Sequence, residues 1–311
     1  MRQLNIKLSE WLETVNEQVA LHKAQGVEAT PISAREGLAN LTRTYVEPGP
    51  EMPASETLVS GNKYNVPVRI YLPENAATDT TIIFCHGGGQ MSGSVSVYDP
   101  ICRRIADACA RNLVSVDYRR SPENPHPAGV EDLLAVVRGL GPALDRKSVA
   151  HQNRWILMGD SGGGAITAAV TRLLQHEQHN ITAQVLIYPS LDYTLSMPSV
   201  VENGSGYLLE KEKIDWYFDN NFQGAENRLS CSPLHGEFTK NLPSTLMITA
   251  EFCPLRDEGI AYGKKLREVN VPLETLHLED MIHTFLNLES LVPDACAKVY
   301  RHIGEFVRKL D

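Results

Sequence analysis

The sequence predicts an α/β fold in which a mostly parallel central sheet is covered by helices on both faces. Short apolar runs alternate with longer helical patterns from about residue 60 to the C-terminus, and strands separated by helical segments are typical of parallel sheets. The run Ile-Leu-Met at 156–158 contains no polar residue, as expected for a strand buried on both faces. A chain of 311 residues with 42% hydrophobic residues is long enough to bury a sizeable core.

The predicted elements follow one another in a regular order. Leu8, Leu12, Val15 and Val19 form one apolar stripe in an N-terminal segment that reads as helical to about residue 45. From Asn65 the apolar pattern changes to a period of two, which indicates a half-buried strand. The main series then comprises strands at 81–85, 113–116, 155–158, 185–188 and 246–250, helices at 101–111, 128–140 and 165–174, and a closing helix around 299–307.

One segment, at about 194–230, interrupts this alternation. It has no strand pattern, but Ile214, Tyr217 and Phe218 fall at helical spacing. We therefore expect a helical N-terminal part at 1–50 and a main α/β domain at 51–311 that carries an insertion at about 194–230. The two helical parts either dock on the core or form a small cap over the end of the sheet.

Charge and cysteine usage indicate which partners and which compartment to expect. The net charge of −9 with no basic run argues against nucleic acid and anionic membrane surfaces. No stretch reaches the length of a membrane span, and the charged N-terminus lacks a signal-peptide core. The 6 cysteines are scattered without a Cys-x-x-Cys pair, so we expect reduced thiols in a cytoplasmic protein with no metal site.

Ser161 is the predicted nucleophile. It stands in Gly159-Asp160-Ser161-Gly162-Gly163, between the strand at 155–158 and a helical pattern. A strand, Gly-x-Ser-x-Gly and a helix together predict a sharp turn that exposes the serine hydroxyl. Glycine at 159 and 163 removes the side chains that would clash in such a turn. The competing interpretation, a glycine-rich turn that happens to hold a serine, does not explain this context.

A second glycine-rich stretch, His86-Gly87-Gly88-Gly89, directly follows the strand at 81–85. A serine that attacks an ester generates an oxyanion, which needs N–H donors placed about 2.7–3.1 Å away. We predict Gly87, Gly88 and Gly162 as the donors. A phosphate-binding loop is less consistent with the sequence, because neither a following lysine nor Gly-x-Gly-x-x-Gly spacing is present.

His283 is the predicted base. A serine hydroxyl is a poor nucleophile until a neighbouring base takes its proton. His283 lies C-terminal to the serine and after the last predicted strand, in a loop that begins with Glu279-Asp280-Met281. His277 lies just before this loop, in a stretch interpreted as a strand of its own, where a structural role is the better interpretation.

Several motifs in order resemble the hormone-sensitive-lipase-like branch of the α/β-hydrolases, close to bacterial acetyl esterases. The resemblance runs from about residue 60 to the C-terminus, and it implies an α/β-hydrolase fold, a two-part helical cap, hydrolysis of short acyl esters without a cofactor, and often a homodimer in the cytoplasm. The motifs are His86-Gly87-Gly88-Gly89, Asp117-Tyr118-Arg119 with Pro122-Glu123, Gly159-Asp160-Ser161-Gly162-Gly163, Pro254-Leu255-Arg256-Asp257-Glu258, and Met281-Ile282-His283-Thr284-Phe285.

The chain departs from this family at Cys253. The family places its catalytic aspartate directly before the Pro-Leu-Arg-Asp run, where this chain has a cysteine. The acid accepts the Nδ1–H of the histidine and stabilises the imidazolium, which a neutral thiol does poorly. Asp192, Glu251 and Asp257 are, in that order, the candidate substitutes, and each also has an ordinary structural interpretation. Ionisation of Cys253 beside a protonated histidine is a further alternative.

The sequence therefore predicts a carboxylic-ester hydrolase whose small-molecule ester substrate is attacked by Ser161 with His283 as base. The alternative is a weakly catalytic or non-catalytic protein that binds a small molecule on a hydrolase scaffold. The retained serine, histidine and glycines favour the enzyme, since a binding protein would be free to lose them. Turnover of an ester distinguishes the two functions.

Overall fold

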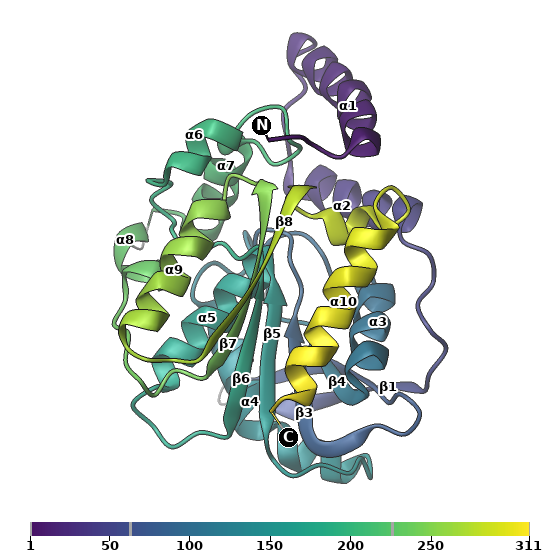
Figure 1. Ribbon diagram of the computed structural model, residues 1–311, viewed down its shortest axis with the longest axis vertical. Helices are drawn as coiled ribbons and strands as arrows, with labels where there is room; N and C mark the ends of the chain where they lie inside the picture. The colour runs from purple at the N-terminus through teal and green to yellow at the C-terminus, as the bar shows by residue number, and fades with distance from the viewer. Residues whose placement is uncertain (1, 62–63, 225–226, 311) are drawn as a thin grey trace.

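The centre of the molecule is a single sheet (Figure 1). Within residues 2–61, 64–224 and 227–310, which the computed structural model describes, the strand order is β1-β2-β4-β3-β5-β6-β7-β8. β2 pairs antiparallel with β1 and β4, and all other neighbours are parallel, which confirms the predicted mostly parallel sheet. The strands are β1 (Ala54–Ser60), β2 (Asn65–Tyr71), β3 (Ala77–Cys85), β4 (Arg111–Val116), β5 (Trp155–Asp160), β6 (Ile181–Ile187), β7 (Ser244–Phe252) and β8 (Leu273–Ile282).

Helices cover both faces of the sheet. In β3, Ile82 and Phe84 belong to the core on one face, whereas Ile83 and Cys85 belong to the core on the other. This alternation follows from the period of two along a strand, and it explains why the central strands are apolar throughout. The helices are α3 (Asp99–Cys109) and α10 (Pro293–Arg308) on the first face, and α4 (Ala128–Arg146), α5 (Ser161–Leu174) and α9 (Arg256–Glu268) on the second.

Most of the remaining helices gather at the end of the sheet to which the carboxyl ends of β7 and β8 point, while the short helix at Arg228–Cys231 lies lower, at the left edge of the view (Figure 1). They come from the N-terminal segment and from the insertion, with one short turn after β8. Ligands of α/β sheets bind at this end, so these helices lie where a binding site is expected. Their bounds are α1 (Ile6–Ala24), α2 (Pro31–Tyr45), α6 (Pro198–Asn203), α7 (Lys211–Phe222), α8 (Arg228–Cys231), η1 (Pro233–His235) and η2 (Phe285–Leu288).

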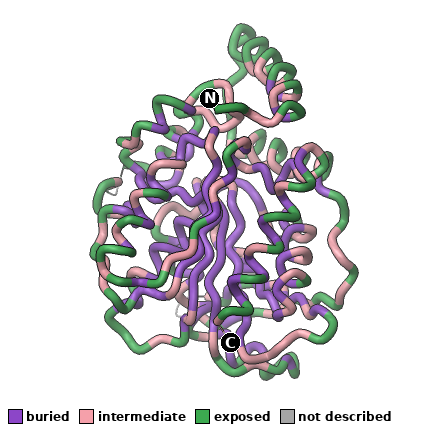
Figure 2. The backbone as a smooth tube through the Cα atoms, viewed as in Figure 1, coloured by how far each residue is buried: buried purple, intermediate pink, exposed green. Residues whose placement is uncertain are grey.

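α1 is mostly exposed. Only Leu8 and Leu12 of its predicted apolar stripe are buried, and Figure 2 shows the helix mostly exposed at the top of the molecule, above the buried sheet. Lys23 near its end pairs with Glu210 and Glu212, at 3.0 and 3.2 Å, which links the N-terminal segment to the insertion.

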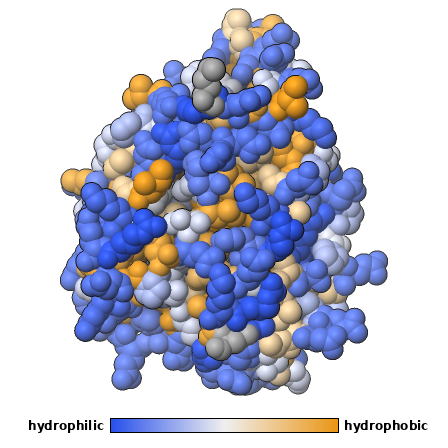
Figure 3. Space-filling model, in the orientation of Figure 1, coloured by the Kyte–Doolittle hydropathy of each residue, from blue (hydrophilic) through white to orange (hydrophobic). Residues whose placement is uncertain are grey.

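The sequence patterns missed β1. Its residues alternate between exposed and partly buried, and Val59 is the only fully buried one, because β1 is an edge strand that presents one face to solvent. Figure 3 shows a mostly hydrophilic surface on the visible face, with apolar residues in small separate groups. Within the part of the chain that the structure describes, no helix combines the length and apolar character needed to cross a membrane.

Candidate active site

The turn between β5 and α5 presents Ser161 at the carboxyl end of the sheet. Ser161 has a φ of 50°, a left-handed conformation that costs energy for a residue other than glycine. A Cβ on Gly159 would overlap the carbonyl oxygen of Gly163, and a Cβ on Gly163 would overlap that of Cys85. Glycine is therefore required at both positions, as the sequence predicted. Because Ser161 is the first residue of α5, the positive end of this helix lies beside it.

His283 lies directly beyond the end of β8 and meets the serine. The Ser161 Oγ and His283 Nε2 atoms are 2.9 Å apart. The imidazole is 3% exposed and lies edge-on to the Tyr188 ring, with centroids 4.8 Å apart. Burial, with a smaller contribution from the charge of Lys213, lowers the pKa of His283 to about 3. The ring is therefore neutral at physiological pH, as a base must be.

Cys253 occupies the other side of this imidazole. It follows β7 directly, and its Sγ lies 3.2 Å from His283 Nδ1. The amide of Leu255 donates a hydrogen bond to the same sulfur at 3.3 Å. Burial raises the pKa of the Cys253 thiol well above its usual value. A neutral thiol thus lies where the resemblance implies a carboxylate. If Ser161 donates to Nε2, the proton of the neutral imidazole is on Nδ1 and points at Sγ.

Asp192, the first-ranked substitute acid, is used elsewhere. Its carboxylate accepts hydrogen bonds from the hydroxyls of Thr194 and Ser196, both at 2.6 Å, and lies 3.1 Å from His235 Nε2. Against the desolvation of this buried group, these bonds hold its pKa below the ordinary value. Among the described residues, its partners do not include His283, so the expected reach from Asp192 to the imidazole is absent from this conformation.

Glu251 and Asp257 are also engaged by other groups. Glu251 pairs with Arg256 at 2.9 Å and with His277 at 2.9 Å. Asp257 accepts from Arg256 Nε at 2.8 Å. Within the described part of the chain, neither carboxylate is hydrogen-bonded to His283. Of the four acid-side residues that the sequence singled out, the structure brings only Cys253 to the histidine.

One predicted oxyanion donor requires correction. The amide of Gly87 donates to Asp160 Oδ1 at 2.6 Å and is therefore unavailable to a substrate. The amides of Gly88 and Gly89 have no acceptor among the described residues. A Cβ on Gly162 would lie 3.0 Å from the Gly89 nitrogen, which shows how closely this loop approaches the serine turn. The amides of Gly88, Gly89 and Gly162 thus remain without an acceptor at this site among the described residues.

The contacts of Asp160 could not be foreseen from the sequence. Besides Gly87, its carboxylate accepts a hydrogen bond from the Tyr98 hydroxyl at 3.0 Å. It is 2% exposed, and burial raises its pKa to about 7. Asp160 therefore ties the glycine loop to the serine turn. Its place as the variable residue beside Ser161, preceding a helix, was the only signal in the sequence.

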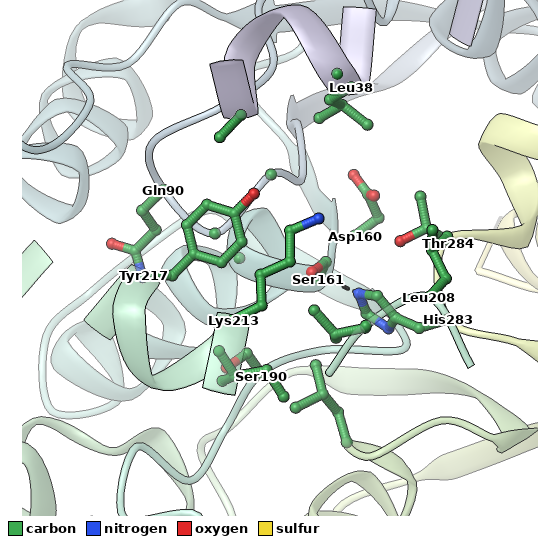
Figure 4. Close-up of a pocket in the computed structure, with 18 of the residues that line it drawn as sticks. Leu38, Gln90, Asp160, Ser161, Ser190, Leu208, Lys213, Tyr217, His283 and Thr284 are labelled. Atoms are coloured by element: carbon green, nitrogen blue, oxygen red, sulfur yellow. Dashed lines mark hydrogen bonds between the residues drawn. The ribbon is translucent and has the colours of Figure 1, made fainter. Parts of the chain in front are cut away.

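A cavity of about 280 Å³ opens in front of these groups (Figure 4). Its inner wall comes from the glycine loop, the serine turn and His283, and its outer wall from α2 and from residues 208–218 of the insertion. The outer wall is mainly apolar. It is formed by Ser33, Ala34, Gly37, Leu38, Leu41, Leu208, Leu209, Lys213, Ile214, Tyr217 and Phe218.

Comparison with known proteins connects this geometry to a family. Residues 82–287 match a family described as alpha/beta hydrolase fold. The chain is 34% identical over 256 residues to the carboxylic ester hydrolase LipN of Mycobacterium tuberculosis, covering 78% of this chain and 68% of the relative. It is 30% identical over 253 residues to an ethyl acetate hydrolase of Pseudomonas putida, covering 79% of each.

A solved structure has the same fold over nearly the whole chain. The crystal structure of an alpha/beta hydrolase enzyme from the metagenome of Lake Arreo, Spain, is 25% identical with a TM-score of 0.88, and the match covers 99% of this chain and 98% of that one. The resemblance inferred from the motifs is confirmed. The chain belongs to the α/β-hydrolase family, in its hormone-sensitive-lipase-like branch.

Proposed function

We propose that the protein is a carboxylic-ester hydrolase in which Ser161 is the nucleophile, His283 the base, and Cys253 the group that orients the histidine. The observation that carries the proposal is the line of contacts at the cavity floor. Ser161 Oγ lies 2.9 Å from one nitrogen of His283, and Cys253 Sγ lies 3.2 Å from the other. The esterase activity in the names of LipN and the ethyl acetate hydrolase supports the same chemistry.

The reaction proceeds in two halves through an acyl-enzyme. Ser161 Oγ attacks the carbonyl carbon while its proton passes to His283 Nε2, and the carbonyl oxygen becomes an oxyanion near the free amides of Gly88, Gly89 and Gly162. The ester C–O bond then breaks and the alcohol leaves with the proton from His283. Water attacks the acyl group by the same route, which releases the carboxylic acid and restores the Ser161 hydroxyl.

Cys253 performs part of the work of a catalytic aspartate. As an acceptor for Nδ1–H it favours the tautomer that leaves Nε2 free, and it restricts rotation of the ring. Because the buried thiol is neutral, it gives the imidazolium no counter-charge. The imidazolium of the transition state is therefore less stabilised than beside a carboxylate, and we expect slow but measurable turnover.

Short acyl esters are the proposed substrates. The cavity of about 280 Å³ is enclosed by two chain segments, which limits the length of an acyl chain that fits. Cleavage of p-nitrophenyl butyrate with a higher kcat/KM than the palmitate is expected. A higher value for the palmitate would contradict this substrate range.

The experiment that tests the proposal is steady-state hydrolysis of p-nitrophenyl butyrate, together with labelling by an organophosphate. Turnover and labelling of Ser161 as the only serine are expected, and both should disappear in Ser161→Ala. The thiol at the acid position favours one second candidate, a protein that binds a small ester without turnover. Such a protein would bind the butyrate but release no nitrophenol.

A cytoplasmic homodimer is part of the same proposal, on the basis of the family resemblance. Light scattering on the purified protein and fractionation of cells that produce it are the corresponding measurements.

A further inference from the structure

The cavity in front of Ser161 contains one unpaired cation. Lys213 is the only lysine or arginine among the described residues that line it. Within the described part of the chain, no hydrogen bond or ion pair joins Lys213 to another residue. Lys213 is exposed at the cavity mouth, and Figure 4 shows its side chain extending from α7 into the pocket.

The carboxylates near Lys213 in sequence are all occupied by other cations. Glu210 and Glu212 lie 3.0 and 3.2 Å from the ammonium group of Lys23. On the same helix, Asp215 and Asp219 lie 2.6 and 2.5 Å from the guanidinium group of Arg228. Four acidic groups therefore lie along α7 or directly before it, yet among the described residues the lysine that faces the cavity has no acidic partner.

The one carboxylate in the cavity lining does not balance Lys213 either. Asp160 is 2% exposed and is bound by the Gly87 amide and the Tyr98 hydroxyl. Its burial raises its pKa to about 7, so near neutral pH its negative charge is only partly present. Asp160 is thus engaged by the glycine loop and the tyrosine, and among the described residues it forms no ion pair with Lys213.

Two further observations indicate that an anion would be favoured in this cavity. Lys213 lies in the first turn of α7, where the positive end of the helix dipole adds to its charge. The hydroxyl of Ser190, which also lines the cavity and is 6% exposed, has no hydrogen-bond partner among the described residues. A purely apolar acyl or alcohol group would offer the buried Ser190 hydroxyl no hydrogen-bond partner and Lys213 no counter-charge.

We infer that the cavity takes esters that carry a carboxylate group, and that Lys213 binds this carboxylate. The inference rests on the proposed esterase function and specifies its substrate class. The substrates are monoesters of dicarboxylic acids, or hydroxy acids that are acylated at the hydroxyl and keep a free carboxylate. Lys213 determines specificity and takes no part in the bond-breaking steps. Because the ion pair forms at an exposed cavity mouth, its effect on kcat/KM is about tenfold rather than several thousandfold.

The test compares charged esters with neutral isosteres of the same shape. In one arm the charge is in the acyl group, with monoethyl glutarate against its primary amide and ethanol release as readout. In the other arm the charge is in the alcohol part of the ester, so 4-acetoxybutanoate is compared with 4-acetoxybutanamide and acetate release is measured. We expect kcat/KM to favour the carboxylate about tenfold in at least one arm at low salt, and the ratio to fall at 0.5 M NaCl, a concentration chosen because salt screens exposed charges.

Substitutions assign the preference to a residue. In Lys213→Met the ratio of kcat/KM for the charged ester to that for its neutral isostere should fall to about 1. In Lys213→Glu the neutral ester should be preferred, whatever the absolute rates. Lys211→Met is the matched control, since Lys211 is an exposed lysine of the same helical turn outside the cavity lining. It should keep the wild-type ratio. A ratio of 1 in both arms for the wild type, or an unchanged ratio in Lys213→Met, would overturn the inference.

Failure of the proposed esterase function can be told apart from failure of the inference about Lys213. If p-nitrophenyl butyrate is cleaved but none of the four esters is, the inference is overturned and the esterase proposal stands. If p-nitrophenyl butyrate is not cleaved either, the esterase proposal is wrong. Calorimetric titration of the same esters into Ser161→Ala then tests the anion site without turnover. Tighter binding of the carboxylates that is lost in the double variant with Lys213→Met supports the site, and equal binding of charged and neutral esters contradicts it.

Discussion

The two sides of the Ser161–His283 pair are built in different ways. On the serine side, backbone geometry positions the reacting groups through glycines that have no room for a side chain and a loop held by Asp160. On the histidine side, the same fold delivers the imidazole to the serine, but one side chain, Cys253, determines how well the imidazolium is stabilised. The serine side cannot change without distorting the turn, whereas the histidine side can change its chemistry and keep its geometry.

The largest effect is expected on the serine side, for Ser161→Ala. Loss of the nucleophile in a serine hydrolase lowers kcat by about 10⁶-fold, and we expect residual hydrolysis of p-nitrophenyl butyrate close to background. Alanine at this position also removes no buried packing, so the melting temperature should stay near that of the wild type. Turnover above one tenth of the wild-type rate would place the nucleophile elsewhere.

Asp160→Ala should give the next largest effect. It leaves the Gly87 amide and the Tyr98 hydroxyl without their acceptor, which costs about 1–3 kcal/mol for each buried group. The loop that carries the oxyanion donors then loses its support, and kcat should fall by about 10²-fold, the effect of removing one such donor.

Two milder variants serve as controls for Asp160. Tyr98→Phe removes one of the two hydrogen bonds and should cost less than the alanine variant. Asp160→Asn can still accept from Gly87 and donate to the tyrosine oxygen, so it should lie between wild type and Asp160→Ala. Equal kcat in all four proteins would show that Asp160 does not support the loop.

On the histidine side, Cys253→Asp should make the enzyme faster. A carboxylate accepts Nδ1–H more strongly than a thiol and offers a counter-charge to the imidazolium, for which loss of the aspartate sets an upper limit of about 10⁴-fold. Because Sγ already contacts the ring, we expect a smaller gain in kcat, about tenfold to hundredfold. Cys253→Ala, which keeps neither contact nor charge, should be slower than wild type. A folded Cys253→Asp protein that is no faster would mean that the acid position does not limit catalysis.

The smallest effects are expected for Asp192→Asn, Glu251→Gln and Asp257→Asn. Each carboxylate has other partners in the structure, so kcat for p-nitrophenyl butyrate should change by less than about threefold in variants whose melting temperature shows that they are folded. If one of them abolishes turnover in a folded protein, that residue is the acid and Cys253 is not involved.

Most of the fold was predictable because the buried strands are apolar throughout and the helices carry apolar stripes. β1 was not predictable, since an edge strand with a single fully buried residue has almost no alternation of apolar and polar residues. The Ser161–His283 pair followed from the motifs and their order. The hydrogen bonds of the glycine loop could not be predicted from the motifs. Gly87 and Gly88 look equivalent in sequence, and only the position of Asp160 decides which amide is free. Asp192 was ranked first for its place after β6, but its own loop residues Thr194 and Ser196 bind it instead.

The central claim is that a neutral thiol orients a neutral His283, and NMR titration of the His283 side chain in the resting protein tests it most directly. Because burial places the pKa of His283 near 3, below its ordinary value of about 6.5, the ring becomes protonated only as the pH falls toward that value. Across pH 5 to 8 the nitrogen spectrum should therefore show an unchanging neutral imidazole with its proton on Nδ1, directed at Cys253. Protonation with a midpoint above pH 6, or a neutral ring with its proton on Nε2, would contradict the account.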